Sequence, residues 1–235
     1  MKLKRQTTTL VPKNDTGPGM ANLEKLERED LPHLEKVLAS SETAMGFVPN
    51  SMLTMSHMPQ LTMAFSILAG TVFGADLKAL LNAYADSVPD DPRREEALSP
   101  DLIQLIAFAT STAAGCRYCQ AHTSHNAHRS GVSEDKLADL LNYETSEHFS
   151  AAEKALVALA LAAGAVPNES TAAHFDRLKA HFSQRQISQI VATISLFGFL
   201  NRWNDTMATE LEEIPRGFAE RELAAGGWQV GKHAS

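Results

Sequence analysis

Residues 99–131 read SPDLIQLIAFATSTAAGCRYCQAHTSHNAHRSG, and this stretch predicts two consecutive helices separated by a glycine. Ser99 is a favourable N-cap, and the proline that follows it suits the first helical position. Gly115 ends this first helix, because glycine readily takes the left-handed conformation of a helix C-terminus. The second helix then runs from Cys116 to a stop near Gly131.

The rest of the chain also has a helical pattern. Apolar residues are not gathered into the alternating runs that are typical of strands, and there is no convincing hairpin signal. Further helices are expected at residues 31–41, 51–57, 59–73, 75–87, 151–163, 169–181, 184–200 and 203–213, with one of about eight residues capped by Ser133. The sequence therefore predicts an all-α fold.

Three parts are expected along the chain. Residues 1–21 are rich in Lys, Thr, Gly and Pro and are predicted to form a flexible N-terminal arm. Residues 22–215 form one all-α domain, whose CxxC core spans 99–165. Residues 216–235 are expected to be a C-terminal tail.

Composition excludes several classes of function. A net charge of −7 and the absence of a Lys/Arg cluster argue against nucleic acid as a partner. The apolar stretches at 155–163 and 190–200 are too short or too polar to span a bilayer, so no membrane partner is expected. Residues 1–20 contain no apolar segment of the secretory kind. The expected compartment is the cytoplasm.

Cys116 and Cys119 are the only cysteines in the 235 residues. Residues three apart share one face of a helix, so these thiols can close a disulfide across one turn. The start of a helix also lowers the pKa of a thiol. Close cysteines in a reducing compartment are catalytic or metal-binding more often than structural. We therefore predict a redox-active pair.

Other interpretations of the motif fit less well. Haem attachment requires His directly after the second cysteine, where this chain has Gln120. A thioredoxin fold requires a preceding strand, but residues 103–113 look helical. A zinc site made from the two cysteines, His122 and His125 would spread its ligands over roughly 180° of one helix. Cysteines that only pack in the core would explain the motif poorly, because this chain has two cysteines and both lie in one CxxC. No metal or cofactor is predicted.

His122 is the first candidate for a proton acceptor. It lies about 60° from Cys119 around the helix, so a neutral imidazole there could take the thiol proton. His125 and His128 rotate away from the thiols and are expected to face solvent.

The core segments LIQLIA at 102–107 and AGCRYCQAHT at 114–123 resemble the alkylhydroperoxidase D / carboxymuconolactone decarboxylase superfamily. The longer "peroxidase-related" members are similar in two further segments, GFVPN at 46–50 with PQL at 59–61, and LFGFLNRWND at 196–205. With the match at 151–163, the resemblance covers most of residues 31–213.

The resemblance implies an all-α, AhpD-like helical domain that assembles into homo-oligomers, often trimers or hexamers. It implies a hydroperoxide substrate and an external thiol reductant or reductase protein. By the same resemblance, Cys119 is the attacking thiol and Cys116 the resolving one, with a proton relay from a Glu on the preceding helix and a His after the CxxC.

Two positions depart from the family pattern. Gln104 stands where the family has Glu, and Gln cannot carry a proton at physiological pH. Thr123 stands where the family usually has His, with His122 one residue earlier. The relay could use His122, Asp101 or Glu95 and its neighbour Glu96, or it could be lost.

The predicted function is a thiol-dependent hydroperoxide reductase that uses Cys116, Cys119, His122 and Gln104. Two alternatives remain open: a lactone decarboxylase of the carboxymuconolactone type, and a non-catalytic oligomeric redox sensor. Asn201, Arg202 and Asp205 are expected to be structural, with Arg202 paired to Asp205 at a helix end.

Overall fold

The computed structural model describes residues 21–234, and they form helices with no strand among them. The predicted all-α fold is therefore confirmed. The expected N-terminal arm lies outside the described residues, apart from Ala21. No helix within the described part of the chain is both long enough and apolar enough to cross a membrane.

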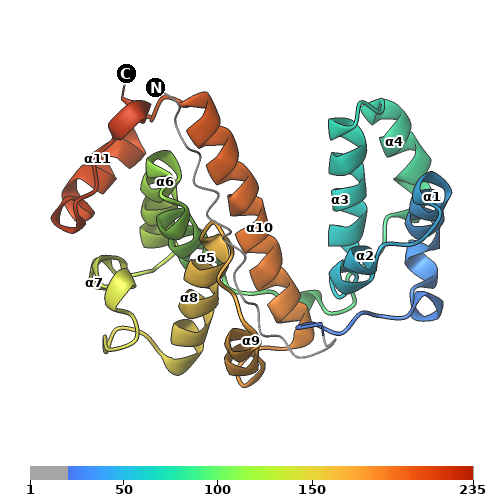
Figure 1. The fold of residues 1–235 in the computed structure, drawn as a ribbon, viewed down its shortest axis with the longest axis horizontal. Coiled ribbons are helices and arrows are strands. Elements are labelled where there is room, and N and C mark those ends of the chain that lie inside the picture. The colour runs from blue at the N-terminus through green and yellow to red at the C-terminus, as the bar shows by residue number, and fades with distance from the viewer. Residues whose placement is uncertain (1–20, 235) are drawn as a thin grey trace, which may run out of the picture.

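The helices are arranged in two regions, which Figure 1 shows side by side. The N-terminal region contains α1 (Glu35–Met45), α2 (Asn50–Met55), α3 (Pro59–Val72) and α4 (Leu77–Tyr84). Its small core is formed by Leu31, Leu34, Val37, Leu38, Met52, Leu53, Met63 and Tyr84.

The C-terminal region contains α5 (Pro100–Ala114), α6 (Arg117–Arg129), α7 (Glu134–Ala138), α8 (Ala151–Gly164), α9 (Ala172–Lys179), α10 (Gln184–Met207) and α11 (Glu213–Glu222). Helix α5 is central and packs against α6, α8 and α10. Gly164 permits the close approach of α8, because a Cβ there would lie 2.8 Å from the Thr110 carbonyl oxygen. This region has its own, larger core.

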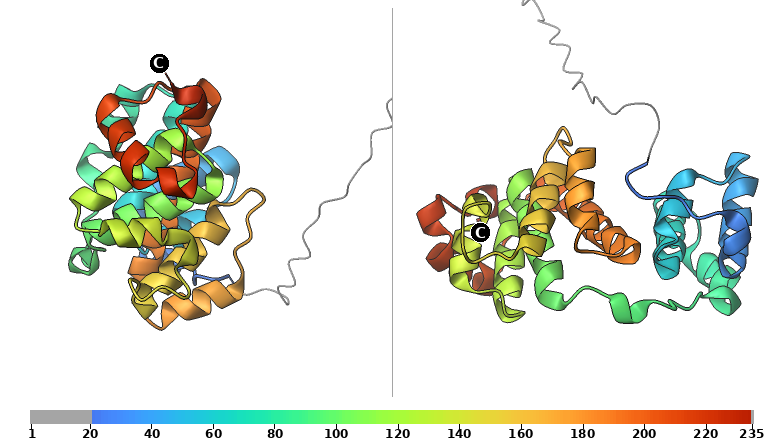
Figure 2. Two further views of the ribbon diagram at one scale, coloured as in Figure 1. Left: turned by 90° about the vertical axis from the view of Figure 1, so that its left-hand side faces the viewer. Right: turned by 90° about the horizontal axis from the view of Figure 1, so that it is seen from below.

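Residues 85–99 connect the two regions, as Figure 2 shows in the view from below. Arg185 on α10 pairs with Asp91 at 2.6 Å, and both side chains are buried. The Leu98 amide donates to Gln189 Oε1 at 2.9 Å. These contacts fix the connecting segment along α10 and set the start of α5.

Helix α10 is longer than predicted. A break was expected between residues 200 and 203, but the helix is continuous to Met207. The reason is packing: Asn201 and Asn204 turn inward and are buried, so the polar cluster lies on the inner face of a helix and not in a loop. Ala208 then takes a left-handed conformation (φ 49°) that ends the helix.

The chain after α10 returns over α6. Residue 216, where the tail was expected to begin, lies inside α11, and α11 packs on α6 and α7. The short turn Gly231–His233 also packs on α6. The C-terminal residues thus belong to the same packed body as the CxxC motif.

Two helix faces leave large apolar side chains exposed. On α3 and the residue after it these are Phe65, Leu68, Val72 and Phe73. On α10 they are Val191, Leu196, Phe199, Trp203 and Met207. Figure 1 shows α3 and α10 at the facing edges of the two regions.

Candidate active site

The two thiols lie at the start of α6. Gly115 ends α5 with φ 73°, and Cys116 follows it as the N-cap of the next helix. The Cys116 Sγ accepts a hydrogen bond from the Cys119 backbone N–H at 3.4 Å. Both residues are buried and both are free cysteines, so the pair is in its dithiol form. The prediction that the pair shares one helix start is consistent with this geometry.

The environment separates the acidities of the two thiols. A hydrogen bond from the Cys119 thiol lowers the pKa of Cys116 despite burial, and the Cys119 amide adds to the effect. The same thiol–thiol hydrogen bond, together with burial, raises the pKa of Cys119. A thiolate at a helix N-terminus also faces the positive end of the helix dipole. Cys116 is therefore the thiol that ionises first.

Helix α10 contributes side chains that lie next to the thiols. Asn204 Nδ2 donates to Cys119 Sγ at 3.5 Å, and Asn204 is buried. Asn201, one turn earlier, is also buried, and its amide atoms have no hydrogen-bond partner among the described residues. Asn204 lies within residues 196–205 but was not among the candidate residues that the sequence singled out.

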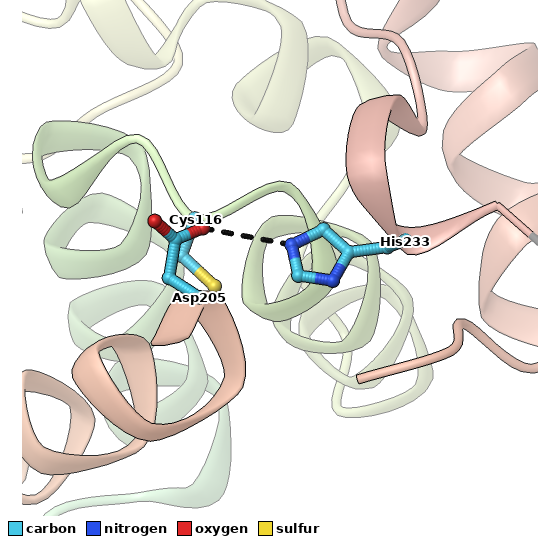
Figure 3. Close-up of side chains that lie close together, drawn as sticks. All are labelled: Cys116, Asp205 and His233. Carbon is cyan, nitrogen blue, oxygen red and sulfur yellow. Dashed lines mark ion pairs between the residues drawn. The ribbon is translucent and has the colours of Figure 1, made fainter. Parts of the chain in front are cut away.

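Asp205 and His233 complete the cluster around Cys116, as Figure 3 shows. Their ligand-type atoms and the Cys116 sulfur all lie within 4.8 Å of one another. Asp205 pairs with Lys232 at 2.8 Å and faces His233 Nε2 at 3.6 Å. The expected pairing of Asp205 with Arg202 is therefore wrong, because the returning C-terminal segment supplies the cation instead.

His233 has one oriented nitrogen and one free nitrogen. Its Nδ1 lies 2.8 Å from the Thr209 carbonyl oxygen, which can only accept, so Nδ1 carries the hydrogen. The Nε2 atom is buried and has no hydrogen-bond partner in the described chain. Its lone pair is directed toward Asp205 and Cys116.

His122 has a different partner from the one predicted. Its Nε2 lies 2.7 Å from Glu212 Oε2, and the Tyr118 hydroxyl donates to the other oxygen of the same carboxylate at 3.1 Å. The Tyr118 and His122 rings are 4.5 Å apart between centroids. Burial, followed by the hydrogen bond to Glu212, raises the pKa of Tyr118 to about 12. His122 thus forms a hydrogen-bonded group with Glu212 and Tyr118, and its hydrogen bond is not made to a thiol.

The two positions that depart from the family pattern offer no proton acceptor. The Gln104 Oε1 atom is buried without a hydrogen-bond partner in residues 21–234. The Thr123 hydroxyl donates to the Cys119 carbonyl at 2.6 Å, which is an intrahelical bond. Glu96, considered as a substitute, is held by Arg93 and Ser183 near the start of α10.

Among the described residues, Cys116, Asp205 and His233 also form the one group with spacing suitable for a metal ion. A thiolate, a carboxylate and an imidazole are acceptable zinc ligands, but a closed structural site takes four. His125 and His128 lie outside it, with their rings against Phe218 at 5.4 and 5.2 Å. The arrangement suits thiol chemistry with a nearby base.

Little in the sequence pointed to His233. It lies in the segment set apart as a tail, and no motif relates it to the CxxC. Only the reversal of the chain after α10 brings it to Cys116. Asp205, in contrast, was singled out within residues 196–205, although not with the partners it has.

Comparisons with known proteins give a family match and several similar proteins. Residues 75–162 match the family model described as the carboxymuconolactone decarboxylase family. The uncharacterised protein YnjA of Escherichia coli (strain K12) is 30% identical over 115 residues, which are 49% of this chain and 63% of that relative. The match thus spans less than two thirds of the relative's length.

Solved structures of a debrominase are also similar. The apo crystal structure of the debrominase Bmp8 is 34% identical with a TM-score of 0.51, over 83% of this chain and 95% of that one. A cysteine-to-alanine variant of Bmp8 in complex with 2,3,4-tribromopyrrole is 33% identical with the same TM-score, over 84% of this chain and 95% of that one. An AhpD-core, peroxidase-related protein from Ralstonia eutropha JMP134 is 24% identical with a TM-score of 0.41, over 79% of this chain and 88% of that one.

Proposed function

Because the chain belongs to the carboxymuconolactone decarboxylase family, we propose that it is a thiol-dependent reductase whose working group is the Cys116/Cys119 dithiol. The observation that supports this most directly is the buried thiol pair at the N-terminus of α6, where the Cys119 backbone N–H donates to Cys116 Sγ. One thiol is acidified and the other holds its proton, so the pair has both a nucleophile and a resolving thiol.

A hydroperoxide is the first proposed substrate. One thiolate attacks the outer peroxide oxygen, the O–O bond breaks and the alcohol leaves, so that the cysteine becomes a sulfenic acid. The second thiol then attacks this sulfur, water leaves and the disulfide closes. Two electrons have passed from the dithiol to the peroxide. An external thiol reductant or a reductase protein returns the disulfide to the dithiol.

Reductive dehalogenation is the second candidate, and it is favoured by the similarity to the debrominase over nearly all of that chain. In this reaction hydrogen replaces bromine on an aromatic ring and bromide leaves. The two electrons again come from the dithiol, which closes to a disulfide. The same thiol pair therefore serves both candidates, and they differ in the substrate that reaches it.

The test is steady-state turnover with a dithiol reductant, comparing tert-butyl hydroperoxide and 2,3,4-tribromopyrrole. We expect turnover of one substrate by the wild-type protein and by His148→Gln, a control at a half-exposed histidine that pairs with Asp139. We expect none from Cys116→Ser or Cys119→Ser. Turnover of peroxide by both cysteine variants at the wild-type rate would overturn the reductase proposal.

A further outcome separates an enzyme from a sensor. A single stoichiometric oxidation of the dithiol, with no multiple turnover of either substrate in the presence of reductant, would contradict the reductase and favour the redox sensor. Bromide release that depends on both cysteines, without peroxide consumption, would select the second candidate.

A further inference from the structure

The buried His233 has an unused nitrogen directed at the reactive cysteine. Nδ1 is fixed as a donor by the Thr209 carbonyl, and the His233 backbone carbonyl accepts from the Leu211 amide at 3.0 Å. The segment 209–211 therefore holds both the ring and the backbone of His233. Its Nε2 lone pair is left without a hydrogen bond in the described residues, although the side chain is fully buried. Such a group calls for a specific explanation.

We propose that His233, with Asp205 behind it, is the proton acceptor and donor for the Cys116 thiol, and that it replaces the relay which positions 104 and 123 have lost. The proposal rests on the proposed reductase function. The Cys116 sulfur, the Asp205 carboxylate and the His233 imidazole converge from three separate elements of the fold, as Figure 3 shows. Cys116 is accordingly the attacking thiol, and Cys119 resolves it.

The geometry suits this role. An imidazole that donates from Nδ1 to a carbonyl presents a basic Nε2, the arrangement that a neutral proton acceptor needs. Once Nε2 is protonated, Asp205 Oδ1 at 3.6 Å stabilises the imidazolium. The sulfur–nitrogen separation is at most 4.8 Å, so the two groups are close but not hydrogen-bonded here, and catalytic contacts of this kind often tighten only when substrate binds.

The proton and electron steps balance with a hydroperoxide. Nε2 of His233 takes the Cys116 thiol proton, and the thiolate attacks the outer peroxide oxygen. The O–O bond breaks, its electron pair goes to the leaving alkoxide, and His233 returns the proton to give the alcohol. Cys116 is now a sulfenic acid. The Cys119 thiol attacks it, its proton leaves with the hydroxyl as water, and the external thiol reduces the resulting disulfide.

Other ionisable groups near His233 also affect how the activity depends on pH. They are Lys232 on the same turn, Asp205 on α10, and Tyr118, Cys116 and Cys119 at the start of α6. Glu212, in the segment before α11, is instead hydrogen-bonded to His122 and Tyr118. None of these offers a second neutral base directed at Cys116.

The experiment compares wild-type protein with His233→Gln, Asp205→Asn and the control His148→Gln. The first readout is the thiolate absorbance of the reduced protein as a function of pH, which needs no substrate. We expect the midpoint of the more acidic thiol to move up toward the ordinary value of about 8.5 in His233→Gln and to stay unchanged in the control. A wild-type titration curve in His233→Gln would overturn the proposal.

The second readout is the pH profile of turnover. Loss of a general acid and base typically costs about 10²–10⁴-fold, so we expect a loss in that range for His233→Gln at about pH 7. The profile of this variant should lose the alkaline limb that reports the imidazolium. The Asp205 side chain is half-exposed, so Asp205→Asn leaves no cavity. This variant should keep the alkaline limb but move it to lower pH, because one anion beside the imidazolium is removed.

The two readouts distinguish this proposal from the reductase proposal. A shifted titration midpoint in a protein that turns over neither substrate supports the relay and contradicts the reductase. Turnover that requires both cysteines, with an unchanged pH profile in His233→Gln and Asp205→Asn, supports the reductase and overturns the relay. Thermal unfolding of each variant shows whether His233→Gln has kept its fold, and Asp205→Asn tests the relay without the buried substitution.

Discussion

The two regions of the molecule differ in what they bury. The C-terminal region buries a large apolar core together with the thiols, Asn204 and His233. The N-terminal region buries eight apolar residues and leaves a row of large apolar side chains exposed on α3. Small cores give little stability by themselves, so we expect the N-terminal region to depend on further contacts. The candidate site therefore lies in one region, and the other offers surface for packing.

The exposed apolar faces of α3 and α10 make the first prediction, which concerns the expected homo-oligomer. Large exposed apolar patches mark interaction sites, and a second copy of the chain can cover both faces reciprocally. We expect Phe199→Glu combined with Trp203→Glu, on the outer face of α10, to reduce the sedimentation mass to that of the monomer. Leu141→Glu, at a still more exposed leucine away from α10, is the control. An unchanged mass in the double variant would contradict an interface on α10.

The Asp91–Arg185 pair joins the connecting segment to the C-terminal region, and its loss gives the next largest effect. Both side chains are buried, with 7% and 3% of their surface exposed. Removing one partner leaves a buried charge unpaired, which costs about 3–5 kcal/mol. We expect Asp91→Asn to lower the free energy of unfolding by this amount in urea at neutral pH. A loss below about 1 kcal/mol would mean that water solvates Arg185 when Asp91 is gone.

The same pair predicts how stability depends on pH. The hydrogen bond from Arg185 lowers the pKa of Asp91, and Arg93 with Ser183 lowers the pKa of Glu96 to about 2. A carboxyl whose pKa is lower in the folded state stabilises the fold above its unfolded pKa, roughly 3.9–4.3 here. That contribution is lost as the pH falls through the folded value. We expect the urea concentration at the unfolding midpoint to decrease as the pH drops below about 4. The decrease should be smaller in Asp91→Asn.

The sequence predicted those features that depend on local pattern. The helical character of the chain, the start of α5 at Pro100 and the position of the thiols at the start of α6 all follow from capping residues and spacing. Features that depend on distant parts of the chain were not predictable. The approach of His233 to Cys116 requires the turn at Ala208 and the return of the chain over α6, and no periodicity encodes that path.

A pair of core substitutions tests whether the two regions unfold separately. Leu38 and Leu156 are both fully buried, the first in the N-terminal core and the second in the C-terminal core. Each change to alanine should cost about 2–5 kcal/mol in the region that contains it. We expect Leu156→Ala to make the buried thiols react faster with a thiol reagent, and Leu38→Ala to leave their rate unchanged. Equal acceleration by both variants would show that the regions unfold as one unit.

Two helix starts provide the smallest and most closely matched test. Ser150 caps α8 inside the C-terminal region: Glu153 N–H donates to its hydroxyl at 3.3 Å, and the Glu153 carboxylate accepts from the Ser150 amide at 2.9 Å. Ser99 occupies the same N-cap position of α5, at the junction with the connecting segment, but its side chain makes no capping hydrogen bond. Serine therefore accepts a capping hydrogen bond at the start of α8 but not at the start of α5.

Loss of a working N-cap costs about 1 kcal/mol, so Ser150→Ala should lower the free energy of unfolding by that amount. Ser99→Ala should change it by only a few tenths, because Pro100 removes one of the free amides and fixes the first turn. Urea unfolding of both variants beside the wild type measures the difference. An equal loss in the two would mean that Ser99 caps α5 in solution, and that the junction between the regions is as firmly ordered as the interior of the C-terminal region.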